Sequence, residues 1–162
     1  MRRYLFILAL PVLLIGCAMQ PKSDESNSSI YEIAVAPNVS HEDILTSLKS
    51  LSEGMNMVNP AQFPIGEHLR ERGQTPEGPL EVHAYCSLSL GADIMLDHPE
   101  FVVFAPCRIA VYQRNGQLYL GVARPTHDLR NIKNPTPRAQ KAAQELERLL
   151  IEIVNKASRG EF

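Results

Sequence analysis

The dipeptide Asn115-Gly116 constrains this chain more than any other local feature, because it is the preferred two-residue turn of a β-hairpin. Residues with strand-forming side chains flank it on both sides, from 109 to 114 and from 117 to 122. The sequence therefore predicts two antiparallel strands joined by this turn. A two-residue turn also fixes the register, so that Arg114 is expected to pair with Gln117 and Ile109 with Val122.

This register sorts the side chains of the hairpin onto two faces, because successive side chains of a strand point in opposite directions. The first face is apolar and carries Cys107, Ile109, Val111, Leu118, Leu120 and Val122. The second face carries Arg108, Ala110, Tyr112, Tyr119 and Gly121. The apolar face is predicted to be buried, which would place Cys107 in the core or at its edge.

Hydrophobic periodicity and capping residues predict the other elements. His41, in the first turn of the first helix, is expected to be solvated. The segments 56–79 and 126–135 are otherwise predicted to be irregular, since prolines, glycines and polar residues dominate them. We expect a strand over 30–36, a helix from Ser40 and Asp43 to near Gly54, a short helix within 64–72, a strand over 80–85, a helix between Cys86 and Pro99, and an amphipathic helix from Thr136-Pro137 to Ala157.

The first residues have the pattern of a bacterial export signal. Arg2 and Arg3 precede an apolar run that is too short to span a bilayer comfortably and that ends at Gly16-Cys17. Leu14-Ile15-Gly16-Cys17 resembles the bacterial lipobox. The resemblance implies that residues 1–16 are removed and that Cys17 is lipidated, with palmitate among the acyl chains.

We therefore expect a lipoprotein of the cell envelope. Ala18 stands where an aspartate would favour the inner membrane, so the periplasmic face of the outer membrane is the expected location. Residues 17–29 are polar and predict a flexible tether, and 30–162 predict one α+β domain, since 44% of the residues are hydrophobic. The formal net charge of −2 becomes more negative without Arg2 and Arg3, which excludes nucleic acid as an expected partner.

Cys86 and Cys107 are the cysteines that remain for the domain once Cys17 is assigned to lipid. One interpretation is a disulfide, because an exported chain meets an oxidising compartment. A second is two separate buried thiols. A third is a reactive or ligand-binding pair, since a helix N-terminus favours a thiolate and Arg108 adds positive charge. A disulfide requires that their strands be antiparallel neighbours, which would bring both sulfurs to the same end of the sheet.

Within the third interpretation, the pair serves either thiol redox chemistry and sulfur species or a soft metal such as copper. The weak candidates to complete a metal site are His83 and Met95, although a single histidine on a strand is ordinarily structural. The chain contains no Gly-rich phosphate loop, metalloprotease helix motif, nucleophile elbow or Ser/His/Asp grouping. The sequence therefore favours a binding or interaction module over an enzyme, without a predicted cofactor, and with an envelope protein or a small ligand as partner.

Three stretches resemble a family of bacterial and archaeal proteins. They are Tyr85-Cys86-Ser87-Leu88, Asp97-His98-Pro99, and the run from Ala105-Pro106-Cys107 through the hairpin to Tyr119. They are similar to the domain of unknown function 302, over about residues 29–125, although many members have Asn-Pro at Ser87-Leu88 and Leu at Ala105. The resemblance implies an α+β fold with a curved, largely antiparallel sheet and helices packed on one face, similar to TATA-box-binding-protein-like folds. It implies no reaction.

Overall fold

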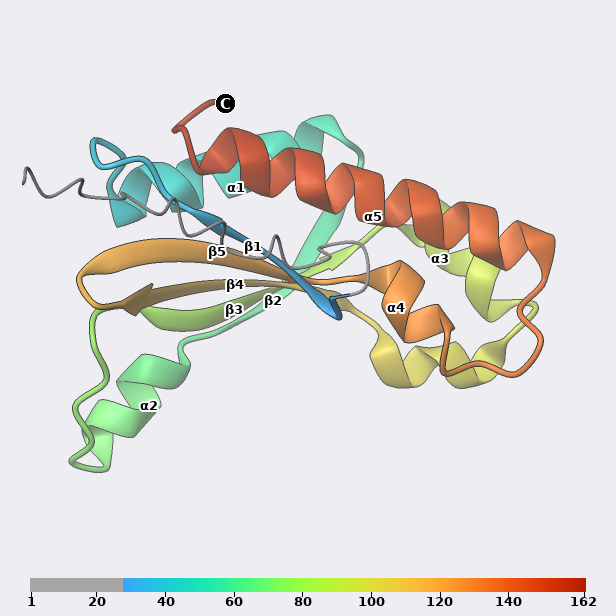
Figure 1. The fold of residues 1–162 in the computed structure, drawn as a ribbon, viewed down its shortest axis with the longest axis horizontal. Coiled ribbons are helices and arrows are strands. Elements are labelled where there is room, and N and C mark those ends of the chain that lie inside the picture. The colour runs from blue at the N-terminus through green and yellow to red at the C-terminus, as the bar shows by residue number, and fades with distance from the viewer. Residues whose placement is uncertain (1–27) are drawn as a thin grey trace, which may run out of the picture.

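The computed structural model describes residues 28–162 and contains an open antiparallel sheet in the order β1-β5-β4-β3-β2. The strands are β1 (Ile30–Ala34), β2 (Val58–Phe63), β3 (Leu80–Cys86), β4 (Cys107–Arg114) and β5 (Gln117–Ala123). The helices are α1 (His41–Gly54), α2 (Ile65–Glu71), α3 (Leu88–Met95), the 3-10 helix η2 (Pro99–Phe104), α4 (Pro125–Leu129) and α5 (Pro137–Ala157). Helices α1, α3 and α5 lie along one face of the sheet, and α2 stands apart from this layer (Figure 1). The predicted α+β fold is confirmed.

The central hairpin β4-β5 has the predicted turn and register. Asn115 and Gly116 both have positive φ, 52° and 78°, which is the conformation that a two-residue hairpin turn requires. Arg114 pairs with Gln117 and Ile109 with Val122. Ile109, Val122 and their apolar neighbours are fully buried beneath the helices, and Cys107 packs at the edge of this core.

Both long helices begin at the predicted capping residues. The Ser40 hydroxyl accepts a hydrogen bond from the Asp43 amide at 3.1 Å, and the Asp43 carboxylate accepts one from the Ser40 amide at 2.9 Å. The Thr136 hydroxyl accepts from the Ala139 amide at 3.2 Å. The apolar stripe of α5 packs across the sheet, and its buried members are Ala139, Ala142, Ala143, Leu146, Leu150, Ile153, Val154 and Ala157.

Two segments that were predicted to be irregular contain regular elements. Strand β2 lies within 56–79 and pairs with β3 at the sheet edge, with a bulge between Val58 and Ala61. Its side chains are mostly exposed on both faces, so the sequence lacks the alternation that marks a half-buried strand. Pro60 is tolerated there because an edge strand has a side without ladder hydrogen bonds. The short helix α4 falls at the start of 126–135, whereas α2 confirms the helix expected within 64–72.

The first strand ends at Ala34, two residues before the predicted boundary. Residues 1–27 lie outside the described part of the chain, and with them the signal sequence, the lipidation site Cys17 and most of the tether. Across residues 28–162, no helix combines the length and the apolar character needed to cross a membrane.

Candidate functional site

The sheet topology brings Cys86 and Cys107 to one end of the sheet. Strands β3 and β4 are antiparallel neighbours, and Tyr85 at the end of β3 pairs with Cys107 at the start of β4. Both cysteines line a cavity of about 60 Å³, together with Met95 from α3. The structure therefore confirms that the two strands are antiparallel neighbours and that both thiols lie at the same end of the sheet.

The two cysteines are free thiols in the structure. Cys107 lies opposite Tyr85, so Cys86 is offset from it by one residue. A disulfide needs the two Cβ atoms about 4 Å apart with a specific orientation, and an offset of one residue does not place the sulfurs face to face. Binding of one ligand by both thiols needs a less exact geometry than a disulfide, because both side chains need only reach the same cavity.

Cys107 is not an activated nucleophile. Burial raises the pKa of its thiol to about 12, and the neighbouring Cys86 and Asp128 add to this effect. Arg108 opposes the rise in pKa but is outweighed by burial. The thiolate expected from the charge of Arg108 is therefore not supported at Cys107. Cys86 is the last residue of β3 and directly precedes Ser87, the N-cap residue of α3, so it lies at the strand-to-helix junction where it was expected.

Asp128 is a member of the site that sequence reasoning missed. It comes from α4, lines the same cavity, and its side chain forms no hydrogen bond or ion pair with any residue in 28–162. Burial raises the pKa of this carboxyl, while the charges of Arg108 and His127 oppose the rise. Groups whose pKa is shifted by burial within a cavity occur preferentially at functional sites, so Asp128 is a candidate member of this site. The sequence offered no signal for it, because this segment was predicted to be an irregular polar bridge.

Most of the remaining cavity wall is apolar. Phe101 and Phe104 of η2 have ring centroids 5.6 Å apart, and Ile94 of α3 and Leu146 of α5 close the inner side. The side chains that contact the cavity therefore come from elements far apart in sequence. Burial against this wall explains the raised pKa values of the two titratable groups described above.

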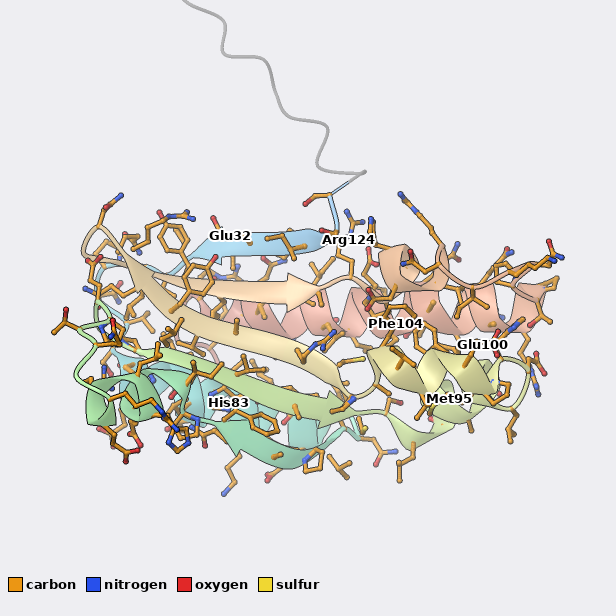
Figure 2. All side chains as sticks on the ribbon, turned by 90° about the horizontal axis from the view of Figure 1, so that it is seen from below. Glu32, His83, Met95, Glu100, Phe104 and Arg124 are labelled. Atoms are coloured by element: carbon orange, nitrogen blue, oxygen red, sulfur yellow. The ribbon has the colours of Figure 1, made fainter. Side chains whose placement is uncertain are left out.

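His83 does not belong to this site. In Figure 2, Met95 and Phe104 lie in the right half of the molecule and His83 lies in the left half; His83 does not line the cavity. The His83 ring is buried, and its Nε2 lies 3.0 Å from Oε1 of Glu81. Of the four candidate ligands, Cys86, Met95 and Cys107 therefore line one cavity, whereas His83 does not. Among residues 28–162, no three His, Cys, Asp or Glu side chains form a cluster able to hold a metal.

His41 also has a partner that was not predicted. Its Nε2 lies 2.8 Å from the same Glu81 oxygen, so two histidines share one buried carboxylate. Burial acts to raise the pKa of Glu81, but the hydrogen bonds from His83 and His41 lower it below its usual value. His41 remains partly solvated, with 39% of its side chain exposed, but the hydrogen bond to Glu81 was not expected. Helical periodicity could not reveal that α1 begins beside β3.

Comparison with known proteins places the chain in a family. Residues 32–155 match the model of the family described as domain of unknown function DUF302. A protein of Aquifex aeolicus (strain VF5), described as an uncharacterized protein, is 25% identical over 162 residues, with 99% of each chain covered. The crystal structure of an uncharacterized conserved DUF302 protein from Bacillus stearothermophilus is similar with a TM-score of 0.72. It is 21% identical and covers 80% of this chain and 98% of its own. The chain belongs to the DUF302 family.

Proposed function

We propose that this protein is a binding module of the cell envelope, anchored to a membrane through Cys17, whose cavity at the end of β3 and β4 holds a soft cation of the Cu(I) type. The observation that carries the proposal is that three sulfur side chains, those of Cys86, Met95 and Cys107, line one small cavity. Thiolate and thioether sulfurs are the ligands that select Cu(I).

The size of the cavity indicates whether its ligand is an ion or an organic molecule. About 60 Å³ is room for an ion or a few atoms, whereas sites for drug-sized molecules occupy roughly 300–1,000 Å³. An organic cofactor is therefore a poor fit, and a small soft species is a good one.

The charges around the cavity also favour a cation. The Asp128 carboxyl has no ion-pair partner among the described residues, and a bound cation would stabilise its ionised form. Arg108 at the cavity wall opposes this attraction in part. Binding would deprotonate Cys107, whose pKa burial raises to about 12, so the affinity for metal would rise steeply with pH.

Cu(I) titration under anaerobic conditions tests the metal site. The full chain carrying Cys17→Ser, which removes the other thiol, is titrated in competition with a chromophoric Cu(I) chelator. One equivalent per chain is expected, to be lost in Cys86→Ser or Cys107→Ser and weakened in Met95→Leu. Unchanged stoichiometry in the double serine variant would exclude this site.

Thiol redox chemistry is the second candidate function, because two free thiols lie at the same end of the sheet. In that reaction Cys86 and Cys107 would form a disulfide, and an oxidised thiol partner would accept the two electrons and two protons. The protonated state of Cys107 makes it a poor attacking group. A glutathione redox titration with a midpoint near about −200 mV would favour this function, whereas thiols that stay reduced throughout would count against it.

Membrane attachment is tested separately. The lipobox-like residues Leu14-Ile15-Gly16-Cys17 support acylation, and each buried methylene of an acyl chain contributes about 0.8 kcal/mol to anchoring. Growth with labelled palmitate should label the wild-type chain but not Cys17→Ala. Label retained in the variant would contradict the lipoprotein assignment. The expected partners are thus the bilayer and a small ligand or envelope protein, and the net charge of −2 disfavours nucleic acid.

A further inference from the structure

A second and larger cavity lies between helix α1 and the sheet edge formed by β2 and β3. Its volume is about 570 Å³, which is within the range of sites for small organic molecules. We name it the α1 cleft. It is lined by Leu45, Lys49, Ser52, Glu53, Met57, Val58, Asn59, Gln62, His83 and Tyr85.

The floor of the α1 cleft contains a buried hydroxyl without a partner. Tyr85 is fully buried, and among residues 28–162 its hydroxyl has no hydrogen-bond partner. The Asn59 side chain lies beside this hydroxyl without forming a well-aligned hydrogen bond to it, and it opposes the effect of burial, which raises the pKa of Tyr85 to about 12. Asn59 lines this cleft and not the cysteine cavity, so the hydroxyl is directed to the cleft. It is therefore a neutral donor that a ligand could satisfy.

The tautomer of His83 is fixed by its neighbour. The ionised Glu81 carboxylate only accepts hydrogen bonds, so Nε2 of His83, 3.0 Å from Oε1 of Glu81, must donate. In the neutral ring, Nδ1 is then an acceptor, and no residue within 28–162 donates to it. His83 and Tyr85 are two residues apart on β3 and face the same side of the sheet. The floor of the cleft thus offers one donor and one acceptor.

The rim of the α1 cleft carries balanced charge. Lys49 and Glu53 lie one turn apart on α1 and contribute opposite charges, and the exposed residues Asn59 and Gln62 contribute neutral amides. A ligand with a net charge would gain little from such a rim. The walls are apolar at Leu45, Met57 and Val58.

We propose that the α1 cleft binds a net-neutral organic molecule that bears a carboxamide. The carbonyl oxygen of the ligand accepts a hydrogen bond from the Tyr85 hydroxyl, and its amide group donates to Nδ1 of His83. The apolar part of the ligand contacts Leu45, Met57 and Val58. This site is distinct from the sulfur-lined cavity, with which it shares only Tyr85 as a lining residue.

Calorimetric titration of the full chain with N-acetyl-L-leucinamide tests this site. The matched probe is N-acetyl-L-leucine, which has nearly the same shape but carries a carboxylate in place of the terminal carboxamide. We expect saturable binding of the carboxamide and about tenfold weaker binding of the carboxylate. Tyr85→Phe keeps the ring and removes the hydroxyl, and it should raise the Kd for the carboxamide about fivefold.

Two controls separate this site from others. Tyr31→Phe removes a hydroxyl that is hydrogen-bonded to Asn155, outside the cleft, and should leave the Kd unchanged. Cys107→Ser should also leave it unchanged, and Cu(I) should not compete with the carboxamide. The proposal is overturned if the carboxamide does not saturate the chain, if both probes bind equally, if Tyr85→Phe binds like the wild type, or if Cu(I) displaces the probe.

Discussion

Tyr85→Phe is predicted to stabilise the protein in the absence of any ligand. Truncation of a buried tyrosine hydroxyl ordinarily weakens a protein, because a hydrogen bond is lost. Here the hydroxyl is fully buried and forms no well-aligned hydrogen bond with the described residues, although the Asn59 side chain lies beside it. An unsatisfied buried polar group costs about 1–3 kcal/mol, and phenylalanine fills the same ring volume without that cost. We expect the free energy of unfolding to rise by about 1 kcal/mol.

Tyr31→Phe is the matched control for this prediction. Its hydroxyl donates to Oδ1 of Asn155 at 2.7 Å, so its loss should lower the free energy of unfolding by about 1 kcal/mol. Urea denaturation followed by circular dichroism measures both variants, and equal m-values would show that the same surface is exposed on unfolding. A destabilised Tyr85→Phe would refute the reasoning, since it would mean that the hydroxyl is hydrogen-bonded in solution.

Three further predictions concern titratable groups. Because burial raises the pKa of Cys107 from 9.0 to about 12, its alkylation by iodoacetamide at pH 8 should be roughly a thousandfold slower in the native chain than in denaturant, as measured by peptide mass spectrometry. The pKa of Glu81 is lower in the folded protein than its ordinary value of 4.5, so its ionised form stabilises the protein fully above pH 4.5. This contribution is lost as the pH falls through the folded pKa. The free energy of unfolding in urea should therefore fall less on acidification in Glu81→Gln than in the wild type. Glu147→Ala should cost about 3 kcal/mol in urea unfolding, because Glu147 is 6% exposed and pairs with Arg124 at 2.6 Å.

Each of these predictions has an outcome that would contradict it, and the prediction for Glu147 also has a control variant. Cys107 that alkylates at the same rate with and without denaturant would show that its thiol is accessible and ionised. Identical acid profiles for the wild type and Glu81→Gln would show that this carboxylate does not titrate differently on unfolding. Glu145→Ala, two residues from Glu147 but exposed and paired with Arg148, should cost much less stability than Glu147→Ala. Equal losses in the two glutamate variants would remove the special role of the buried pair.

The central hairpin and the long helices were predictable because their signals are local. Asn115-Gly116 determines a turn by its own backbone preferences, and Thr136-Pro137 marks a helix start by capping. These elements could be predicted without knowing which other segments pack against them. The face on which Cys107 lies followed from the same register.

The missed parts depend on contacts between distant segments. Strand β2 is exposed on both faces and owes its conformation to pairing with β3, so hydrophobic alternation does not mark it. Glu147 sits on a helix whose spacing predicts charged residues outside, and it is buried because Arg124 and Thr126 meet it there. The partnership of His41 with Glu81 likewise joins residues forty positions apart.

The candidate site divides in the same way. The convergence of Cys86 and Cys107 followed from the assumption of antiparallel neighbours, which the structure confirms. The sequence could not show that Met95 lines the cavity and that His83 does not, because the path of α3 after β3 decides which side chain reaches the cavity. The unpaired carboxyl of Asp128 required the position of α4, a five-residue helix without its own sequence signal.

The position of β1 has a consequence for the order in which the protein folds. Ile30 at its start pairs with Ala123 at the end of β5, about ninety residues later in the chain. A chain that emerges from a ribosome or a translocation pore with its N-terminus first must leave β1 without its partner until most of the domain has appeared. Such delayed pairing carries a risk of association with other chains, because an unpaired strand is a template for aggregation. Strand β1 is short and carries the exposed charge of Glu32, and both features reduce association with other chains while it is unpaired. Substitution of Glu32 by an apolar residue should therefore lower the yield of folded protein more than it alters the final structure.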